Sequence, residues 1–282
     1  MDNILIADSG STKTDWSLLK NRDTSPFRLQ TSGINPAHCS DNEIQRIILE
    51  VKNKTCDSKI DAIFFYGAGC ATNTLKNKIR YNLFNIFNIE KIEVDSDLIA
   101  AAIALFGDKK GIACILGTGS NSGLYENGVI KKQIPPLGYI LGDEGSGVSL
   151  CKILLNGIFK HQFPEVIIEK FKDEYHLTLP ELINSVYYSG SPASFIASFS
   201  PFILNNIDIP ELREMVIKEF ENFFNKNILP YGMLNNTKVG MVGSIAYNYR
   251  DLLNEAAKKY GLTISTIIKN PLPFLETYFV TK

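Results

Sequence analysis

The feature that most constrains this fold is a pattern that occurs twice: an apolar strand, a turn of Gly, Ser and Thr, and a second strand. The first copy covers residues 3–19 and turns at residues 8–12. The second copy covers residues 111–126 and turns at residues 117–121. Each has the signature of a β-hairpin, although the turn residues do not align well between the copies. The chain is therefore expected to repeat an architecture rather than a sequence.

Helical and strand patterns alternate between and after the two hairpins. Apolar residues recur at spacings of three and four in the expected helices, which are 41–54, 72–87, 98–106, 149–160, 164–175, 180–188, 209–227 and 249–260. Short apolar runs predict further strands at 61–66, 91–94, 238–242 and 262–265. This alternation is typical of an α/β architecture, and the 282 residues suffice for two domains.

Composition excludes several classes of protein. The 29 Lys and Arg residues balance 30 Asp and Glu residues, which argues against a nucleic-acid partner held by a basic field. The sequence has no apolar run of roughly 18 residues, so we expect no membrane span. It also begins without a signal-peptide pattern, and we expect a cytoplasmic protein. The five cysteines form no CxxC pair, which disfavours a disulfide framework or an iron–sulfur cluster.

Three of the expected strands end in small, flexible, hydroxyl-bearing turns. Glycine lets backbone N–H groups approach an anion, and Ser and Thr hydroxyls add donors, which suits a polyphosphate. The turn residues expected to bind a nucleotide are Ser9, Gly10, Ser11, Thr12, Lys13, Gly117, Thr118, Gly119, Ser120, Gly243 and Ser244. No GxxxxGK[ST] segment occurs, so none of the turns is a Walker A loop. Asp8, at the end of the first strand, is the expected Mg²⁺ residue.

Four segments occur in an order that resembles a known family: ADSGSTKT (7–14), GINP (33–36), GTGSN (117–121) and LGDEGSG (141–147). Together they are similar to the N-acetylglucosamine kinase family, grouped with the BadF/BadG/BcrA/BcrD-type ATPases in the acetate and sugar kinase/heat-shock protein/actin superfamily. The resemblance runs over nearly the whole chain. It implies two ribonuclease H-like domains flanking an ATP and sugar cleft, with ATP and Mg²⁺ as cofactors.

The resemblance also implies a domain boundary and the role of each loop. The first domain would comprise residues 1–110. The second, residues 111–282, would carry a helical insertion, and its last residues would pack back on the first domain. The turns at 8–12 and 117–121 would be the first and second phosphate loops, and residues 242–244 the loop on the nucleoside side.

A kinase that phosphorylates a sugar hydroxyl benefits from a carboxylate that orients the hydroxyl and accepts its proton. Asp95 and Asp97 both stand at a strand end before an Ala-rich helix, where capping of that helix is the other explanation. In the resembled kinases the base is an Asp that opens such a helix ahead of the second phosphate loop. This places Asp97 in the role, with Asp95 as the alternative.

The remaining candidates would bind the sugar. Hydroxyl and acetamido groups are held by directional hydrogen bonds, and Asn35 offers both a donor and an acceptor. The resemblance implies that Asn35, Asp97 and Asp143 bind the sugar and that Gly69 backs it, although turn formation also explains Asn35 and Gly69. The family's Gly-Trp-rich stretch before the fourth segment is replaced here by PPLGY at residues 135–139.

The resemblance favours an ATP-dependent kinase that converts N-acetylglucosamine to its 6-phosphate. N-acetylmuramic acid, its anhydro form and glucosamine stay open as substrates. One alternative is an ATPase that drives a partner protein, as the activators of benzoyl-CoA reductase or hydroxyacyl-CoA dehydratase do. Another is a non-catalytic sugar or nucleotide sensor. The expected partner is a small-molecule sugar, and base rates favour a homodimer.

Overall fold

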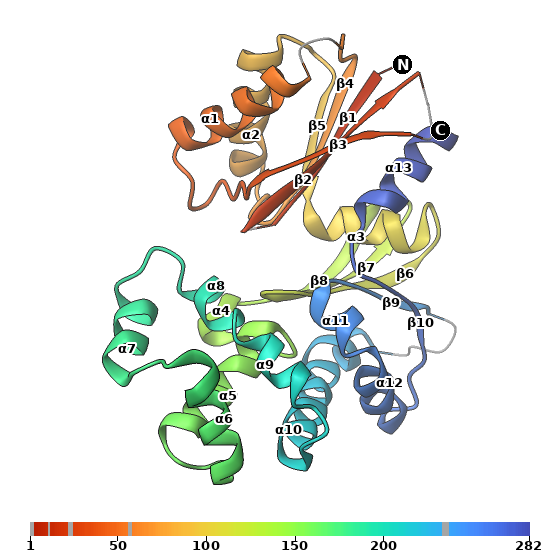
Figure 1. The fold of residues 1–282 in the computed structure, drawn as a ribbon. Helices are drawn as coiled ribbons and strands as arrows, with labels where there is room; N and C mark the ends of the chain where they lie inside the picture. Colours follow the sequence, from red (N-terminus) through yellow and green to blue (C-terminus); the bar gives the residue numbers. More distant parts are fainter. Residues whose placement is uncertain (1–2, 11, 22–24, 56–57, 233–236) are drawn as a thin grey trace. The chain divides into compact units, whose positions relative to one another are not determined.

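The computed structural model describes residues 3–10, 12–21, 25–55, 58–232 and 237–282. The chain divides into two compact units (Figure 1). Unit 1 comprises Met1–Lys110, Tyr125–Ile130 and Asn270–Lys282, and unit 2 comprises Gly111–Leu124 and Lys131–Lys269. Within the described ranges, no helix is long and apolar enough to cross a membrane.

Unit 1 is built on a five-stranded sheet in the order β3-β2-β1-β4-β5. Its strands are β1 (Asn3–Ser9), β2 (Lys13–Lys20), β3 (Phe27–Ser32), β4 (Ala62–Gly67) and β5 (Ile92–Ser96). The first hairpin pairs β1 with β2 in antiparallel register, and β2 pairs with β3 in the same way. Strands β1, β4 and β5 run parallel, so their carboxyl ends meet at one edge of the sheet.

Helices cover unit 1 and bury its apolar residues. They are α1 (Asp41–Lys54), α2 (Asn73–Phe87), α3 (Asp97–Phe106) and α13 (Leu272–Thr281). Ile44, Ile48 and Val51 of α1 are fully buried, as their helical spacing predicts. A capping box between Ser40 and Glu43 fixes where α1 begins.

The C-terminal helix α13 packs in unit 1 against α3, β1 and β2 (Figure 1). The Arg28 guanidinium on β3 makes a two-point ion pair with the Glu276 carboxylate of α13, with Nε at 2.8 Å from Oε1. The rings of Phe64 and Phe279 lie 4.2 Å apart. The last residues of the chain thus complete the unit that the first residues begin.

Unit 2 is built on a second five-stranded sheet, in the order β10-β9-β6-β7-β8. Its strands are β6 (Gly111–Leu116), β7 (Ser120–Glu126), β8 (Val129–Ile134), β9 (Val239–Val242) and β10 (Ile264–Ile268). Residues Tyr125–Ile130, which include the end of β7, the start of β8 and the turn between them, belong to unit 1. Strand β6 is parallel to β9, which is parallel to β10. The strand order matches that of unit 1, with β6 in the place of β1.

The helices of unit 2 form a larger set. They are α4 (Gly138–Leu141), α5 (Gly147–Phe159), α6 (Glu165–Tyr175), α7 (Leu179–Tyr187), α8 (Pro192–Ala197), α9 (Ser200–Asn205), α10 (Pro210–Phe223), α11 (Ser244–Asn248) and α12 (Arg250–Lys259). After α10 the chain continues as a π-helix, η1 (Phe224–Ile228), and a 3₁₀ turn, η2 (Leu229–Tyr231). The expected single helix 209–227 therefore changes its hydrogen-bonding pattern in its last turn.

Candidate active site

The edge of the unit 1 sheet, where its parallel strands end, gathers the predicted acidic residues. The strand register places Ser9 opposite Gly67, and Gly67 opposite Ser96. Asp8 directly precedes the first of these residues, and Asp97 directly follows the last and opens α3. Carboxylates that lie far apart in the sequence therefore reach the same edge, because parallel strands end together.

Asp8 and Asp97 are two half-buried carboxylates with raised pKa values. The pKa of Asp8 is raised to about 7, first by burial and then by the charges of Asp97 and Asp15, while Lys13 opposes this effect. Burial raises the pKa of Asp97 to about 6, although the backbone amides of Leu98 and of Asp97 itself hydrogen-bond its carboxylate. A carboxyl that titrates near 6 is well matched to accept a proton at neutral pH.

Asp95 has partners that distinguish it from Asp97. Its Oδ1 accepts hydrogen bonds at 2.8 Å from Nζ of Lys76, on α2, and from the backbone amide of Ser96. In the part of the chain that the structure describes, Asp97 forms no ion pair of this kind. Of the two candidates for the base, Asp95 is bound to a lysine and Asp97 is not.

The turn of the first hairpin is fixed by both backbone and side-chain contacts. The Gly10 amide donates to the Lys13 carbonyl at 2.9 Å. The buried Ser9 hydroxyl lies 2.7 Å from that of Thr14 and donates to the Ile34 carbonyl at 3.1 Å, so its bonds are made within the protein. Thr12 and Lys13 are exposed, and the Lys13 ammonium pairs with Asp15 at 2.7 Å. The predicted nucleotide residue Ser11 lies outside the described residues.

Two of the predicted sugar residues touch each other in unit 1. Gly69 adopts a φ of +82°, and a Cβ built on it would lie 2.1 Å from Oδ1 of Asn35. The same Oδ1 accepts a hydrogen bond from the Ala37 amide at 3.0 Å, which fixes the side chain. The Ala68 amide donates to the Ser9 carbonyl at 2.8 Å. Asn35 and Gly69 are thereby tied to the strand end that carries Asp8.

In unit 2 the second hairpin turns on Gly117, Thr118 and Gly119 and is anchored by α5. The first amides of that helix, those of Gly147 and Val148, donate to the Gly117 and Thr118 carbonyls at 2.8 and 3.0 Å. The Ser146 hydroxyl caps α5 by accepting from the Ser149 amide. The turn is thus fixed by the start of a helix.

The third predicted loop lies directly against this turn. Gly243 follows β9 with a φ of +126°, and a Cβ on it would lie 2.2 Å from the Leu116 carbonyl oxygen and 3.2 Å from the Gly117 nitrogen. Only glycine fits this position without a shift of the backbone. Ser244 follows as the exposed first residue of α11. The structure thus brings together the predicted second phosphate loop and the predicted nucleoside-side loop.

Asp143 lies against the same turn. Its Oδ1 accepts a hydrogen bond from the Ser120 amide at 3.3 Å, and a Cβ on Gly119 would lie 2.8 Å from its Oδ2. Burial raises the pKa of Asp143, while the Ser120 amide and the charge of Lys152 lower it. Asp143 itself adopts a φ of +59°. The predicted sugar carboxylate of unit 2 is therefore in contact with the predicted phosphate turn.

The loop that carries Asp143 is held by residues that the sequence analysis did not identify. Glu219, on α10, accepts a hydrogen bond from the Gly145 amide at 2.9 Å and another from the Ser149 hydroxyl. The neighbouring Glu144 accepts from Lys226 at 3.1 Å and from Asn227 at 3.2 Å, both on η1. The signal for Glu219 is its spacing, because it shares the buried face of α10 with apolar residues, namely Leu212, Met215, Val216, Phe220 and Phe223.

The donor set of unit 1 fits a magnesium ion. Mg²⁺ is commonly bound through one or two carboxylates and completes its shell with water and phosphate oxygens. Asp8 supplies a carboxylate at this sheet edge, and the nearby charge of Asp97 raises the pKa of Asp8. A divalent cation beside them would offset this repulsion.

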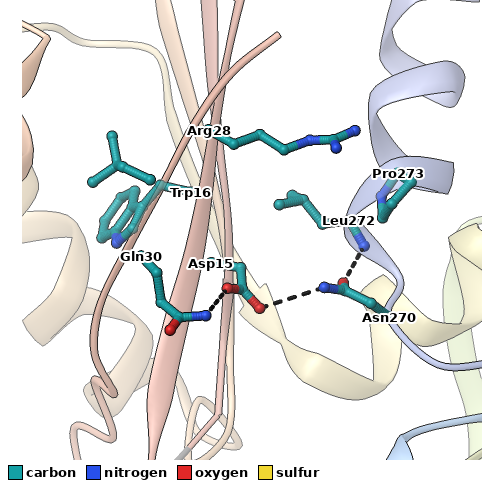
Figure 2. Close-up of a pocket in the computed structure, with 8 residues that line it drawn as sticks. Asp15, Trp16, Arg28, Gln30, Asn270, Leu272 and Pro273 are labelled. Atoms are coloured by element: carbon teal, nitrogen blue, oxygen red, sulfur yellow. Dashed lines mark hydrogen bonds between the residues drawn. The ribbon is translucent and has the colours of Figure 1, made fainter.

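A separate cavity of about 280 Å³ in unit 1 lies between strands β2 and β3 and the start of α13 (Figure 2). Asp15, on its wall, accepts hydrogen bonds from Gln30 at 2.6 Å and from Asn270 at 3.4 Å. Asn270 also accepts from the Leu272 amide at 2.9 Å. None of the predicted site residues lines this cavity.

Comparison with known proteins identifies solved relatives. The sequence matches no protein-family profile and no curated protein. A candidate N-acetylglucosamine kinase from Porphyromonas gingivalis is 41% identical, with 99% of each chain covered and a TM-score of 0.93. A candidate N-acetylglucosamine kinase from Chromobacterium violaceum is 14% identical, with 100% of this chain and 99% of that chain covered and a TM-score of 0.77. A ROK family glucokinase from Streptomyces griseus, solved with glucose and AMPPNP, is 10% identical, with 97% of each chain covered and a TM-score of 0.55.

The two distant structures establish the fold alone, and they confirm the expected α/β architecture of two ribonuclease H-like domains. The Porphyromonas protein is similar enough over nearly the full length to establish the family. The expected resemblance is confirmed: the chain belongs to the N-acetylglucosamine kinase family, whose members are sugar phosphotransferases built on the actin-like ATPase fold.

Proposed function

We propose that this protein transfers the γ-phosphoryl group of ATP to the 6-hydroxyl of N-acetylglucosamine. The observation that carries the proposal is the Asp97 carboxylate, which has a raised pKa and lies at the sheet edge that also bears Asp8. Asn35 and Gly69, joined to that edge through the Ser9 carbonyl, supply the sugar side. The 41% identical relative, a candidate N-acetylglucosamine kinase, supports the choice of sugar.

Asp97 would act as the general base. Its carboxylate accepts the proton of the sugar hydroxyl, whose oxygen attacks the γ-phosphorus while the bond to the β-phosphate oxygen breaks and ADP leaves. The raised pKa keeps the carboxylate basic enough for this step yet ionised at neutral pH. Asp95 is less suited to the role, because Lys76 occupies its carboxylate.

The turns of both hairpins would bind the phosphates of ATP. The unit 1 residues that would contact the phosphates are Gly10, Ser11, Thr12 and Lys13. In unit 2 they are Gly117, Thr118, Gly119 and Ser120, with Gly243 and Ser244 beside them. Backbone amides and hydroxyls fixed in place stabilise the charge that develops on the transferred phosphoryl group. A magnesium ion held by Asp8 would neutralise phosphate charge.

The first test is ADP formation in the presence of ATP, Mg²⁺ and a panel of amino sugars. N-acetylglucosamine should give sugar-dependent ADP, and phosphorus NMR should identify the 6-phosphate. The matched control is 6-deoxy-N-acetylglucosamine, which lacks the accepting hydroxyl and should give only the rate without sugar. ADP formation that does not depend on sugar would favour an ATPase that drives a partner protein. If only N-acetylmuramic acid or glucosamine were phosphorylated, the protein would still be a kinase, but the proposed substrate would be wrong.

A further inference from the structure

The loop at residues 142–147 has a conformation that is costly to adopt unaided. Asp143 has a φ of +59°, in the left-handed region that non-glycine residues seldom occupy. Gly145 follows with a φ of +72°, and a Cβ on it would lie 2.8 Å from the Cβ of Phe223. Such a loop persists only where its surroundings hold it.

Glu219 is the buried anchor that reaches this loop from α10. Its side chain is only 6% exposed, and one carboxylate oxygen accepts from both the Gly145 amide and the Ser149 hydroxyl. These bonds span 74 and 70 residues of sequence, so they join α10 to the loop and to the start of α5. A hydrogen bond to a charged acceptor in a buried setting is among the stronger ones.

The π-helical turn after α10 adds a second anchor. Asn227, which is buried, donates to Glu144 at 3.2 Å, and its backbone carbonyl accepts from the Ser122 hydroxyl at 3.0 Å. Ser122 lies on β7, just past the Gly117–Ser120 turn. The segment α10–η1 therefore contacts both the Asp143 loop and the strand that leaves the phosphate turn.

We propose that Glu219 is a positioning residue that sets the Gly142–Gly147 loop, and through it the Asp143 carboxylate, for sugar phosphorylation. This inference rests on the proposed function for its kinetic consequence. Glu219 acts through Gly145 and Ser149, two and six residues beyond Asp143. Small displacements of a substrate-binding group are costly, since about 1 Å can lower a rate by roughly 100-fold.

The test compares Glu219→Gln and Glu219→Ala with Glu221→Gln. Glu221 is the matched control, because it lies on the same helix and pairs with Lys259. We expect Glu219→Ala to lower kcat/KM for the sugar by about 30- to 100-fold and Glu219→Gln, which keeps the shape, by about 3- to 10-fold. Glu221→Gln should stay within about twofold, and the Kd for Mg-ATP without sugar should change less than about threefold in every variant.

A double-mutant cycle with Asp143→Asn separates positioning from general stability. If Glu219 acts through Asp143, adding Glu219→Gln to Asp143→Asn lowers kcat/KM by much less than Glu219→Gln does alone. The proposal would be overturned if the kcat/KM losses of the two single variants multiplied in the double variant. It would also be overturned if sugar binding and ATP binding weakened equally.

Amide hydrogen exchange measures how firmly the loop is held in the absence of any substrate. In Glu219→Gln, peptides covering residues 138–146 should exchange about 10-fold faster than in the parent, while peptides from α12 should keep the parental rate. An unchanged exchange rate in the loop peptides would show that Glu219 does not fix the loop. If neither parent nor variant phosphorylates a sugar, the proposed function fails, and the exchange data alone decide whether Glu219 fixes the loop.

Discussion

The two sheets share a strand order but carry different residues at the same edge. In unit 1, Asp8 is the last residue but one of β1 and Asp97 directly follows β5, and both carboxylates have raised pKa values. In unit 2, the ends of β6 and β9 lead into Gly117 and Gly243, which approach each other closely. One scaffold thus presents carboxylates at this edge in one copy and closely packed glycine turns in the other.

Sheet topology determines where loops converge in each unit, while the turn residues determine which chemical groups lie there. Parallel strands end together in both sheets, so each unit offers one edge where loops converge. Carboxylates at that edge repel one another and attract a cation. Glycines and hydroxyls there leave room for an anion.

The largest effect is expected at the unit 1 edge, from Asp97→Asn. Loss of the base should lower kcat by about 10²- to 10⁴-fold, with the Kd for Mg-ATP nearly unchanged. The matched control is Asp95→Asn, which removes the partner of Lys76 and should cost less than about tenfold. Steady-state kinetics and calorimetry with ATP check both variants. Near-normal turnover in Asp97→Asn would remove this residue from the mechanism.

In unit 2, we expect Gly243→Ala to disrupt the contact between the loops that follow β6 and β9. The new Cβ meets the Leu116 carbonyl oxygen, so the contact between the two loops must open, and we expect the KM for ATP to rise by about 10- to 100-fold. Gly261→Ala is the control, since Gly261 has a φ of +66° with no atom within 4 Å of the added Cβ. It tests backbone strain without the clash. Equal loss in both variants would show that the loop contact has no special role.

The pH dependence of kcat tests whether Asp97 is the general base. A base must be ionised to act, so kcat should fall as pH drops through about 6, by about tenfold at pH 5. Measured at saturating substrates between pH 5 and 8, the rising limb should be absent from the residual activity of Asp97→Asn. A limb that persists in this variant belongs to another group.

The sugar side of unit 1 is probed by Gly69→Ala. Its Cβ would displace the Asn35 side chain, so we expect the KM for the sugar to rise by about 3- to 10-fold while the KM for ATP stays constant. Together with Gly243→Ala, this variant tests whether the Gly69 and Gly243 turns act on different substrates. A rise in both constants would show that the Gly69 contact is not specific to the sugar.

The smallest effect is on stability, from Asp8→Asn. Because the folded protein raises the Asp8 pKa to about 7 from 3.8, the native state binds this proton more tightly than the unfolded chain. The carboxyl therefore lowers stability progressively as pH rises between these values, and the cost is complete above about 7. We expect Asp8→Asn to raise Tm by about 2–5 °C at pH 8 and not at pH 3. Added Mg²⁺ should stabilise the parent more than the variant, as thermal unfolding with and without the metal would show.

Much of the fold was predictable where one physical signal dominates. Helix α1 was predicted at its observed bounds, because apolar spacing and the Ser40 cap agree. The edge strands β3 and β8 were not predicted, since their residues are mostly exposed and their apolar alternation is weak. Helix α11 was missed because five residues show no period.

The site was predictable in its residue types but not in its contacts. Glycine and hydroxyl turns after strands identify candidate phosphate loops from sequence alone. The contact of Gly69 with Asn35, and that of Lys76 with Asp95, join segments that only the folded sheet brings together. Glu219 was missed for the same reason, because a single carboxylate in an amphipathic helix has no local signal for its partner.

The position of α13 affects when unit 1 can complete its packing during synthesis. Helix α13 follows β10 and all of unit 2 along the chain, yet it packs on β1 and β2, which precede unit 2. Until α13 has been synthesised, Phe64 lacks the ring of Phe279, and Glu276 is not yet present to pair with Arg28. Domains ordinarily fold in the order in which they are made. Unit 1, by contrast, completes its packing only after the residues of unit 2 have been made.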